Sequence, residues 1–252
     1  MLAVERRNTI LTRLQLVGNV VVAELGEEFG VTEETIRRDL EKLEAEGLAK
    51  KTYGGAVAVK KNSLDLPFNV RKSVCTEEKQ YIAELVSREI KDGDTLMLDA
   101  SSTAGFIVKR IKDRKNLTVI TNSVEILIEL SDVEGWTVIS SGGTLREGSL
   151  SLVGGAAIKT ISSFHADIAI ISAKGIDTEF GVSEPNEQVA EIKRAMLENS
   201  TAKILAVDSS KFDKMSLVRI CGLQDANVLV TDKEPDEKWI SRLSTDNVRV
   251  VF

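Results

Sequence analysis

The chain has 252 residues, of which 42% are hydrophobic and 29% are charged, a composition typical of a globular protein that buries a sizeable core. Its formal net charge of −6 argues against nucleic acid as a partner if it is taken alone. The charge is unevenly distributed, because residues 1–62 carry ten Lys/Arg against ten Asp/Glu, which leaves 23 against 29 in the remainder. A locally basic face on a neutral small domain can therefore still bind phosphate.

Several classes of protein are disfavoured by what the sequence contains. The longest apolar runs are of strand length, short of the roughly 20 residues that span a bilayer, so we expect no membrane partner and a cytoplasmic location. Cys75 and Cys221 are the only cysteines and His165 is the only histidine. A disulfide framework, a zinc site and a histidine-based triad are therefore disfavoured, and we expect no metal and no cofactor.

Helical spacing of apolar residues begins near the start of the chain. It predicts a first helix over residues 5–17 and a second, shorter helix over residues 21–29. Gly18 and Gly30 follow them, and glycine can end a helix in the left-handed conformation. A third helix follows directly, so the three form the helix-turn-helix pattern, in which the last helix enters the major groove of DNA.

The third helix divides into a buried side and a polar side. Ile36, Leu40 and Leu43 are spaced i, i+4 and i+7, so they fall on one face. Thr32 can cap the first turn through its hydroxyl. The donors expected to face DNA are Thr32, Thr35, Arg37, Arg38 and Lys42. The alternative is a solvated amphipathic helix whose arginines merely pair with Glu34 or Glu41.

Residues 48–59 change to two short extended pieces around a Gly54-Gly55 pair. Glycines tolerate the positive φ angles of a tight hairpin, so we predict a β-wing. Lys50, Lys51 and Tyr53 lie on or beside it, where they could reach phosphates that flank the groove. The alternative is a plain solvated hairpin.

These residues resemble the DeoR-type family of bacterial sugar-responsive repressors. The matching residues are Val31-Thr-Glu-Glu-Thr-Ile-Arg-Arg-Asp-Leu40, Leu43, Gly47 and Tyr53-Gly-Gly-Ala56. The resemblance implies a winged helix-turn-helix domain, at residues 1–59, that binds double-stranded operator DNA as part of an oligomer. Lys51 stands where arginine is common in that family, which keeps the charge but loses the planar fork for bidentate contact.

A polar, aperiodic segment that contains Pro67 predicts an interdomain linker over residues 60–75, followed by an α/β domain over residues 76–252. The expected strands are residues 95–98, 117–121, 136–140, 167–171, 204–207, 228–230 and 248–251. The expected helices are residues 76–90, 103–111, 123–130, 155–161, 187–199 and 236–243. This alternation predicts a Rossmann-like, mostly parallel sheet, in which ligands bind outside the carboxyl ends of the strands.

Polar residues follow five of these strands. They are Asp99, Ser101, Ser102 and Thr103; Thr121 and Asn122; Gly142 and Gly143; Lys174 and Asp177; and Lys211. Carboxylates suit sugar hydroxyls, whereas Ser, Thr, Gly and Lys suit phosphate. Each loop alone could be an ordinary connection between a strand and a helix, but five such loops at one sheet edge predict a pocket for a phosphorylated sugar.

The resemblance continues through the α/β domain. It covers Asp99-Ala-Ser-Ser-Thr103, Thr121-Asn122, Gly142-Gly143, Gly175-Ile-Asp177, Lys193-Arg-Ala-Met196 and Asp208-Ser-Ser-Lys-Phe212. It implies that Ser101, Ser102 and Thr103 bind phosphate, that Asp99, Asn122 and Asp177 bind sugar hydroxyls, and that Lys193 and Lys211 balance the phosphate charge. Ser101 stands where the family usually has glycine, and Lys174 stands where an aspartate is common.

The family's effector domain is similar in fold to pentose-phosphate isomerases, which raises the alternative of an isomerase-like sugar-phosphate enzyme. Lys174 removes one of the acidic pair that such an enzyme needs as a base, although Glu184 and Glu187 remain nearby in sequence. A third alternative is a protein-interaction module. We expect a non-enzymatic transcriptional regulator, a repressor of a sugar-metabolism operon, that acts as a homodimer or homotetramer under the control of a phosphorylated sugar.

Overall fold

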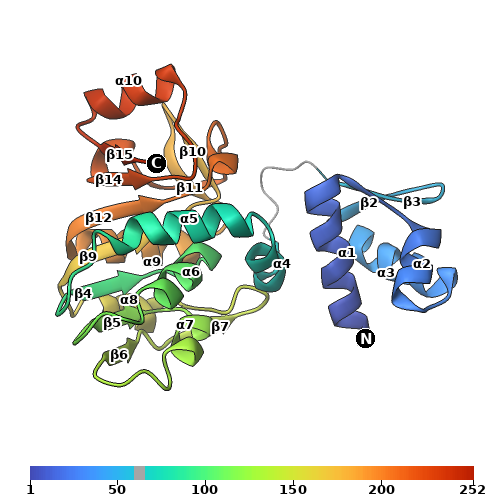
Figure 1. Cartoon of the computed structure of the whole chain (residues 1–252), viewed down its shortest axis with the longest axis horizontal. Coiled ribbons are helices and arrows are strands. Elements are labelled where there is room, and N and C mark those ends of the chain that lie inside the picture. Colours follow the sequence, from blue (N-terminus) through green and yellow to red (C-terminus); the bar gives the residue numbers. More distant parts are fainter. Residues whose placement is uncertain (60–65) are drawn as a thin grey trace. The chain divides into compact units, whose positions relative to one another are not determined.

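The computed structural model describes residues 1–59 and 66–252, and the chain divides into two units, Met1–Val74 and Cys75–Phe252 (Figure 1). The elements of the first unit are α1 (Ala3–Val17), β1 (Asn19–Val21), α2 (Val22–Phe29), α3 (Glu33–Ala45), β2 (Ala49–Thr52), β3 (Gly55–Ala58) and α4 (Phe68–Ser73). The three expected helices and the hairpin are confirmed, and β1 adds a third strand to give an antiparallel sheet in the order β1-β3-β2.

The apolar stripes of the three helices meet in one core. Ile10, Leu14, Leu25, Ile36 and Leu40 are all buried there, as their spacing predicts. Thr32 caps α3 by accepting a hydrogen bond from the backbone N–H of Thr35 (3.3 Å). The buried side of α3 is therefore fixed by packing, and its other side is left to solvent.

The wing is confirmed, but the reason given for its glycine pair was wrong. Neither Gly54 nor Gly55 has a positive φ angle. Gly55 is required because the paired strand β1 lies so close to it that a Cβ atom there would be 1.8 Å from the carbonyl oxygen of Val20. The constraint is thus the close approach of two strands.

Part of the segment predicted as a linker has regular structure. Residues 60–65 of that segment lie outside the described residues. Helix α4 follows, and its Val70 is fully buried in the core of the first unit. The aperiodic pattern did not predict this short helix, whose stability comes from the burial of one side rather than from its length.

A buried ion pair ties α1 to α3. Arg6 Nε lies 2.5 Å from Asp39 Oδ2, and Arg7 Nη1 lies 3.5 Å from Asp39 Oδ1. Asp39 is 4% exposed and Arg6 is 7% exposed, so each charge depends on the other for stabilisation. Sequence periodicity does not predict this pair, because its partners are 33 residues apart.

The second unit is a seven-stranded sheet in the order β15-β14-β12-β9-β4-β5-β6, in which every pairing is parallel. The strands are β4 (Thr95–Leu98), β5 (Thr118–Thr121), β6 (Thr137–Ser140), β9 (Ala166–Ile171), β12 (Ser200–Ala206), β14 (Val228–Val230) and β15 (Arg249–Val251). The predicted fold class is confirmed, and the one large error is that β12 begins four residues early. Three of its first four residues, Ser200, Thr201 and Lys203, are polar, so this part lacks the apolar pattern of a buried strand.

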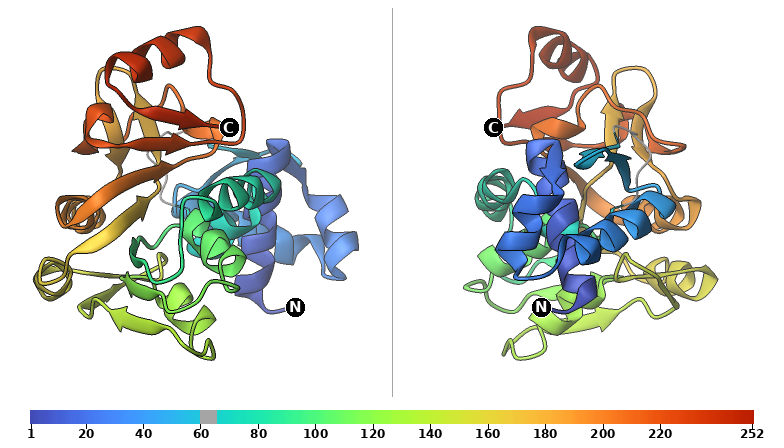
Figure 2. Two further views of the ribbon diagram at one scale, coloured as in Figure 1. Left: turned by 60° about the vertical axis from the view of Figure 1, so that its left-hand side comes forward. Right: turned by 90° about the vertical axis from the view of Figure 1, so that its right-hand side faces the viewer.

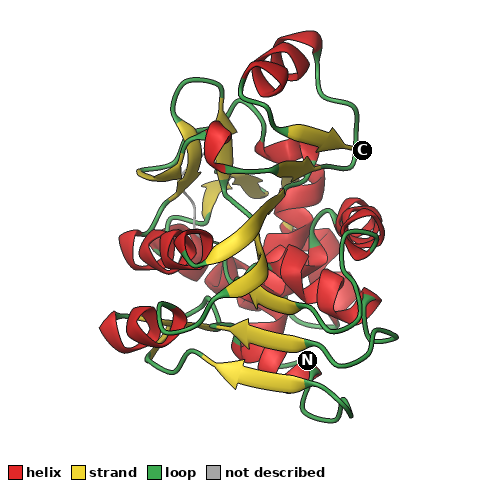
Figure 3. Ribbon diagram, turned by 90° about the vertical axis from the view of Figure 1, so that its left-hand side faces the viewer, coloured by secondary structure: helices red, strands yellow, loops and turns green. Residues whose placement is uncertain are grey.

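Helices cover both faces of this sheet, as Figures 2 and 3 show. One core contains buried residues of α5 (Thr76–Ser87), α6 (Ser102–Arg110) and α7 (Val124–Glu129). The other contains buried residues of α8 (Gly155–Ile161), α9 (Glu187–Glu198) and α10 (Glu237–Thr245). We call these the α5/α6 face and the α8/α9 face.

Short antiparallel elements were not predicted. Strands β7 (Thr144–Arg146) and β8 (Ser151–Val153) form a hairpin, and β10 (Gly175–Asp177), β11 (Gly181–Glu184) and β13 (Val218–Cys221) form a small separate sheet. Two single-turn 3₁₀ helices occur at Ser209–Lys211 and Leu223–Asp225. Strands of three or four residues with polar members carry too little periodic signal to be recognised.

The buried ion pair of the first unit yields a test. Asp39→Ala leaves the Arg6 guanidinium buried without its carboxylate, so we expect the free energy of unfolding to fall by about 3–5 kcal/mol. Glu34→Ala removes an exposed carboxylate from the same helix and should change stability little. Urea unfolding measures both, and a loss for Asp39→Ala no larger than that for Glu34→Ala would contradict the role of the pair.

Candidate functional site

The polar side of α3 carries the predicted DNA-facing residues on its surface. Arg37 pairs with Glu33 (2.6 Å) and Arg38 pairs with Glu34 (3.3 Å), both one turn apart and both exposed. The pairing named as the alternative reading therefore exists for Arg38. Exposed pairs of this kind contribute about 0–1 kcal/mol, so they do not prevent the guanidinium groups from binding another anion.

The wing extends this surface. Lys51 Nζ lies 2.8 Å from Glu41 Oε1, and this contact lowers the pKa of Glu41. Lys42 and Lys50 are exposed and form no ion pair within residues 1–59 and 66–252. Tyr53 is fully exposed after β2. The structure thus places Thr32, Thr35, Arg37, Arg38 and Lys42 on α3 or its cap, and Lys50, Lys51 and Tyr53 on the hairpin.

The predicted effector residues occur at the carboxyl edge of the parallel sheet. Asp99 follows β4, Asn122 follows β5, and Gly142 and Gly143 follow β6. Lys174 follows β9, and Lys211 lies in the loop after β12. Because all seven strands run in the same direction, their carboxyl ends share this edge.

A buried ionic cluster lies at the centre of the edge. Lys193 Nζ from α9 lies 3.1 Å from Asp99 Oδ2, forms an ion pair with Glu184 of β11, and donates a hydrogen bond to the carbonyl oxygen of Ser172 (2.8 Å). Burial disfavours the charged ammonium, but the Glu184 and Asp99 carboxylates outweigh it and raise the pKa of Lys193. The partnership of Lys193 with Glu184 was not predicted.

Asp99 also organises the loops around it. Its Oδ1 accepts a hydrogen bond from Ser101 N (3.0 Å), and its Oδ2 accepts one from Ser172 N (3.0 Å). Ser101 in turn caps α6, because its Oγ accepts a hydrogen bond from Ala104 N (3.0 Å). Ser102 and Thr103, the first two residues of that helix, are buried at its N-terminus. The first N–H groups of a helix lack partners within it, and they attract anions.

Asn122 has an unsatisfied acceptor, and it follows β5 as Asp99 follows the neighbouring strand β4. Its Nδ2 donates to the carbonyl oxygen of Leu152 (3.0 Å), which turns Oδ1 the other way. Oδ1 is buried and has no hydrogen-bond partner in the described part of the chain. Neighbouring Thr121 is occupied structurally, since its hydroxyl donates to the carbonyl oxygen of Leu98 (2.7 Å) and accepts from Ser123 N (3.1 Å). A buried acceptor without a donor is a position where a ligand hydroxyl would be stabilised.

Both residues of the glycine pair after β6 have positive φ angles, and the second also lies too close to its neighbours for a side chain. Gly142 and Gly143 have φ angles of 61° and 104°. A Cβ atom on Gly143 would lie 2.6 Å from the carbonyl oxygen of Val153 and 2.9 Å from the Cβ of Ala157. The pair therefore allows the loop to pass close to β8 and α8.

The loop after β12 contains a second charged group. Lys211 Nζ lies 3.4 Å from Asp208 Oδ2, and Asp208 also accepts from Ser210 N (3.1 Å). Burial opposes ionisation of Asp208, but Lys211, the Ser210 hydroxyl and Lys79 together lower its pKa. Lys79 lies on α5, is 5% exposed, and was not singled out in the sequence.

Asp177 is the last residue of β10 in the small antiparallel sheet, and Lys174 directly precedes that strand. The Asp177 carboxylate accepts hydrogen bonds from Glu179 N and Phe180 N (both 2.9 Å), which lower its pKa. Its Oδ1 is thus committed to the turn between β10 and β11. The backbone N–H of Lys174 donates to the carbonyl oxygen of Ser183 (3.1 Å), so this residue joins β9 to the small sheet.

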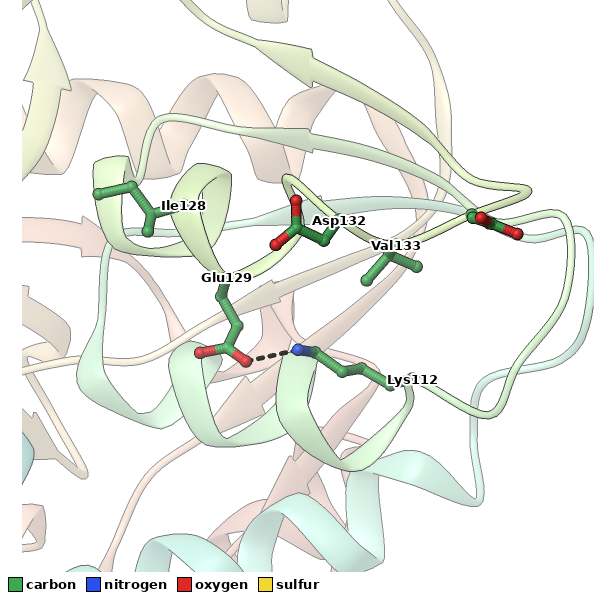
Figure 4. A pocket seen from close by; sticks show the side chains of 6 residues that line it. Lys112, Ile128, Glu129, Asp132 and Val133 are labelled. Carbon is green, nitrogen blue, oxygen red and sulfur yellow. Dashed lines mark hydrogen bonds and ion pairs between the residues drawn. The ribbon is translucent and has the colours of Figure 1, made fainter.

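A surface depression elsewhere contains none of the predicted residues. It is lined by Lys112, Ile128, Glu129, Asp132, Val133 and Glu134, as Figure 4 shows. Lys112 Nζ forms an ion pair with Glu129 Oε1 (2.5 Å) across it. These residues lie at or just after the C-terminal ends of α6 and α7, so the depression lies at the opposite, amino edge of the sheet.

Two further observations concern membrane spans and metal ions. Within the described residues, no helix is long and apolar enough to cross a membrane. Among the same residues, no group of three or more His, Cys, Asp or Glu side chains is arranged to hold a metal ion.

A winged helix-turn-helix unit followed by an α/β unit with a polar carboxyl edge defines a ligand-responsive DNA-binding protein. Two family models match the chain: a DeoR-like helix-turn-helix domain over residues 6–62, and a DeoR C-terminal sensor domain over residues 74–233. The chain belongs to the DeoR family, and it is a transcriptional regulator rather than an enzyme.

Whole-length relatives agree with this assignment. The chain is 40% identical to an uncharacterized HTH-type transcriptional regulator, YulB, of Bacillus subtilis, over 99% of this chain and 96% of the relative. It is 32% identical to the glycerol-3-phosphate regulon repressor of Escherichia coli, over 98% and 97%. It is 37% identical to the transcriptional repressor AccR of Agrobacterium fabrum, over 90% and 89%.

Solved structures resemble the chain more distantly. Ribose 5-phosphate isomerase A of Methanocaldococcus jannaschii matches with a TM-score of 0.41 and 16% identity, covering 54% of each chain. The δ subunit of eIF2B from Chaetomium thermophilum matches with a TM-score of 0.45 and 16% identity, covering 64% of this chain and 57% of that one. Similarity at this level is too low to bear on function.

The lowered pKa of Asp208 predicts a pH dependence. Because its folded-state pKa is below the ordinary value of 3.8, its ionised form stabilises the fold above that pH, and this stabilisation is lost as the pH falls through the folded-state pKa. We expect Asp208→Asn to be less stable at neutral pH and to lose stability less steeply below pH 3.8. Urea unfolding across a pH series measures this, with the exposed Asp132→Asn as the control. Superimposable profiles for Asp208→Asn and wild type would contradict the role of the buried carboxylate.

Proposed function

We propose that this chain is a cytoplasmic repressor of a sugar-metabolism operon, whose first unit binds operator DNA and whose second unit binds a phosphorylated sugar. The observation that carries the effector part is the buried, unpartnered Asn122 Oδ1 at the carboxyl end of β5, the strand next to β4, which leads into α6. A sugar hydroxyl would satisfy this acceptor, and a phosphate suits the N-terminus of α6. The named relatives include a repressor of the glycerol-3-phosphate regulon, which supports this class of effector.

For DNA, we propose that α3 enters the major groove. Arg38 and Lys42, with Thr35 and Arg37, would contact base edges and the nearest phosphates, because they lie opposite the buried stripe of that helix. Thr32, Lys50, Lys51 and Tyr53 would contact the flanking backbone from the helix cap and the wing. The Arg6–Asp39 pair supports this role indirectly, since it fixes the rotation of α3 against α1.

For the effector, we propose that Ser101, Ser102 and Thr103 hold the phosphate, and that Asp99 and Asn122 receive sugar hydroxyls. The loop formed by Gly142 and Gly143 would border the ligand. The remaining predicted residues are Thr121, Lys174, Asp177, Lys193 and Lys211, of which Thr121, Asp177 and Lys193 already hold neighbouring segments in place.

We also propose a homodimer or homotetramer. One winged domain reads only a few base pairs, so a genomic site requires two or more copies in register. The isomerase alternative is not favoured, because Glu184 is committed to the buried ion pair with Lys193 and Glu187 pairs with Arg194 (3.1 Å) at the surface.

The reading role of α3 is tested by Arg38→Ala. Removal of one groove-facing guanidinium should weaken specific operator binding by about 1–3 kcal/mol. Fluorescence anisotropy with DNA from upstream of the chain's own operon, across a salt series, measures this loss. Stability should not change, because the Arg38–Glu34 pair is exposed.

Arg88→Ala is the matched control, since Arg88 is also an exposed arginine that pairs with a glutamate one turn away, Glu84, in the second unit. Operator affinity of Arg38→Ala equal to that of Arg88→Ala would contradict the assignment of α3 as the reading helix.

The effector site is tested by Thr103→Val, which keeps the shape of the side chain but removes the hydroxyl of a residue that is 2% exposed at the N-terminus of α6. Glycerol 3-phosphate and a set of phosphorylated sugars are first screened by thermal shift, because a ligand specific to the folded state raises its stability. We expect Thr103→Val to bind the operator normally but to lose the response to the sugar that stabilises the wild type.

Thr137→Val is the control, as Thr137 begins β6 at the opposite edge of the sheet. A sugar response of Thr103→Val that matches that of Thr137→Val would show that the phosphate lies elsewhere.

A further inference from the structure

The polar side of α3 carries carboxylates as well as cations. The buried stripe of that helix begins at Ile36 and has the spacing i, i+4 and i+7. The same spacing begun two positions earlier gives Glu34, Arg38 and Glu41, which we call the outer ridge of α3. Each residue of an α-helix turns by about 100°, so a shift of two positions turns the side chains by about 200°. The outer ridge therefore lies opposite the buried stripe.

The side chains of the outer ridge are more exposed than those of the neighbouring ion pair. Arg38 and Glu34 are 74% and 62% exposed, whereas Arg37 and Glu33 are 51% and 52% exposed. Arg38 Nε lies 3.3 Å from Glu34 Oε1, so the two groups project together. A groove that accommodates the guanidinium of Arg38 must therefore also accommodate the carboxylate of Glu34.

The two carboxylates of the outer ridge differ in position and in partner. Glu34 is the second residue of α3, and the N-terminal residues of a recognition helix are those that contact base edges. Glu41 lies about two turns further along, and its partner is Lys51 of the wing (2.8 Å). Glu34 is therefore the carboxylate that meets base edges when α3 enters the groove.

A carboxylate in the major groove can be satisfied by few partners. The phosphates that line the groove repel it, and it can only accept hydrogen bonds. Cytosine presents the N4 amino donor alone on its groove edge, whereas adenine presents the N6 amino donor beside the N7 acceptor. Guanine and the thymine carbonyl present acceptors, which repel a carboxylate. The base that suits Glu34 is therefore cytosine.

We propose that Glu34 is a base-reading residue of α3, which accepts a hydrogen bond from the N4 amino group of a cytosine in the operator. This cytosine lies within one base pair of the guanine that Arg38 contacts, because the two side chains meet and one base-pair step is only about 3.4 Å. Glu34 thus contributes specificity rather than affinity, since its charge opposes binding to every other sequence. The proposal rests on the proposed function, because it requires α3 to enter the groove.

Glu33 provides a matched comparison in the same turn of α3. It is also exposed and also pairs with an arginine one turn away, Arg37 (2.6 Å). It lies on the flank of α3 that faces α2, because a Cβ atom added to Gly26 would lie 3.8 Å from its Cγ. Glu33→Ala therefore removes the same charge from the helix N-terminus without removing a group from the outer ridge.

The test begins with duplexes selected from a random library by the intact wild-type chain. Fluorescence anisotropy then measures the affinity for the selected duplex and for duplexes with each single base-pair change. Replacement of the cytosine by thymine puts the O4 acceptor where the N4 donor stood, and it should weaken wild-type binding about tenfold. Glu34→Ala should bind these two duplexes with affinities within about twofold of each other.

Two further variants sharpen the expected result. Glu34→Gln should gain affinity for the duplex with adenine at that position, because an amide both accepts from N6 and donates to N7. Glu33→Ala should keep the wild-type preference for cytosine. Glu34→Ala should also bind unselected duplexes more tightly than wild type, since a negative charge has been removed from the groove-facing surface.

Three results would overturn the proposal while leaving the proposed function intact. They are wild-type base preferences in both Glu34→Ala and Glu34→Gln, an equal loss of cytosine preference in Glu33→Ala, and an equal weakening of all duplexes by Glu34→Ala. The last is expected if Glu34 only orients Arg38. A wild-type chain that selects no sequence, or Arg38→Ala with wild-type affinity for the selected duplex, would instead contradict the proposed function.

Discussion

The carboxylate of Asp99 is the interaction on which the carboxyl edge of the sheet depends. It is 1% exposed, and it is stabilised by the N–H of Ser101, the N–H of Ser172 and the ammonium group of Lys193. These contacts hold the loop after β4, the loop after β9 and helix α9 together. The N-terminus of α6 is consequently presented in a fixed orientation, which is the preorganisation that a binding site for a small anion requires.

In the first unit, a buried ion pair also holds helices in one orientation. Arg6 and Asp39 form a buried pair that fixes the rotation of α3 against α1, so the polar side of α3 faces solvent. In both units, a desolvated ion pair is costly unless every charge has its partner, and so it selects one arrangement of the helices. The exposed Arg37 and Arg38 pairs, by contrast, can exchange their carboxylates for phosphates with little loss.

Apolar patterns predicted the three N-terminal helices and all seven parallel strands, because burial on one or both faces imposes such patterns. The wing was predicted from its glycine pair. Apolar patterns did not predict the pairing of Glu184 with Lys193, since Glu184 lies in a short polar strand whose partners are distant in sequence. Lys79 follows Glu77 and Glu78 in the first turn of a helix, which is the pattern of a solvated residue. Gly55 was predicted for the wrong reason, because the approach of β1 depends on tertiary structure.

The central claim is that one chain couples binding of a phosphorylated sugar at the sheet edge to binding of DNA by α3. Linkage requires the coupling to be reciprocal. The most direct measurement is a pair of titrations of the intact chain: operator affinity with and without the stabilising sugar phosphate, and sugar phosphate affinity with and without operator DNA. We predict that both affinities change by the same factor. Two ligands that bind with full affinity regardless of each other would contradict the account.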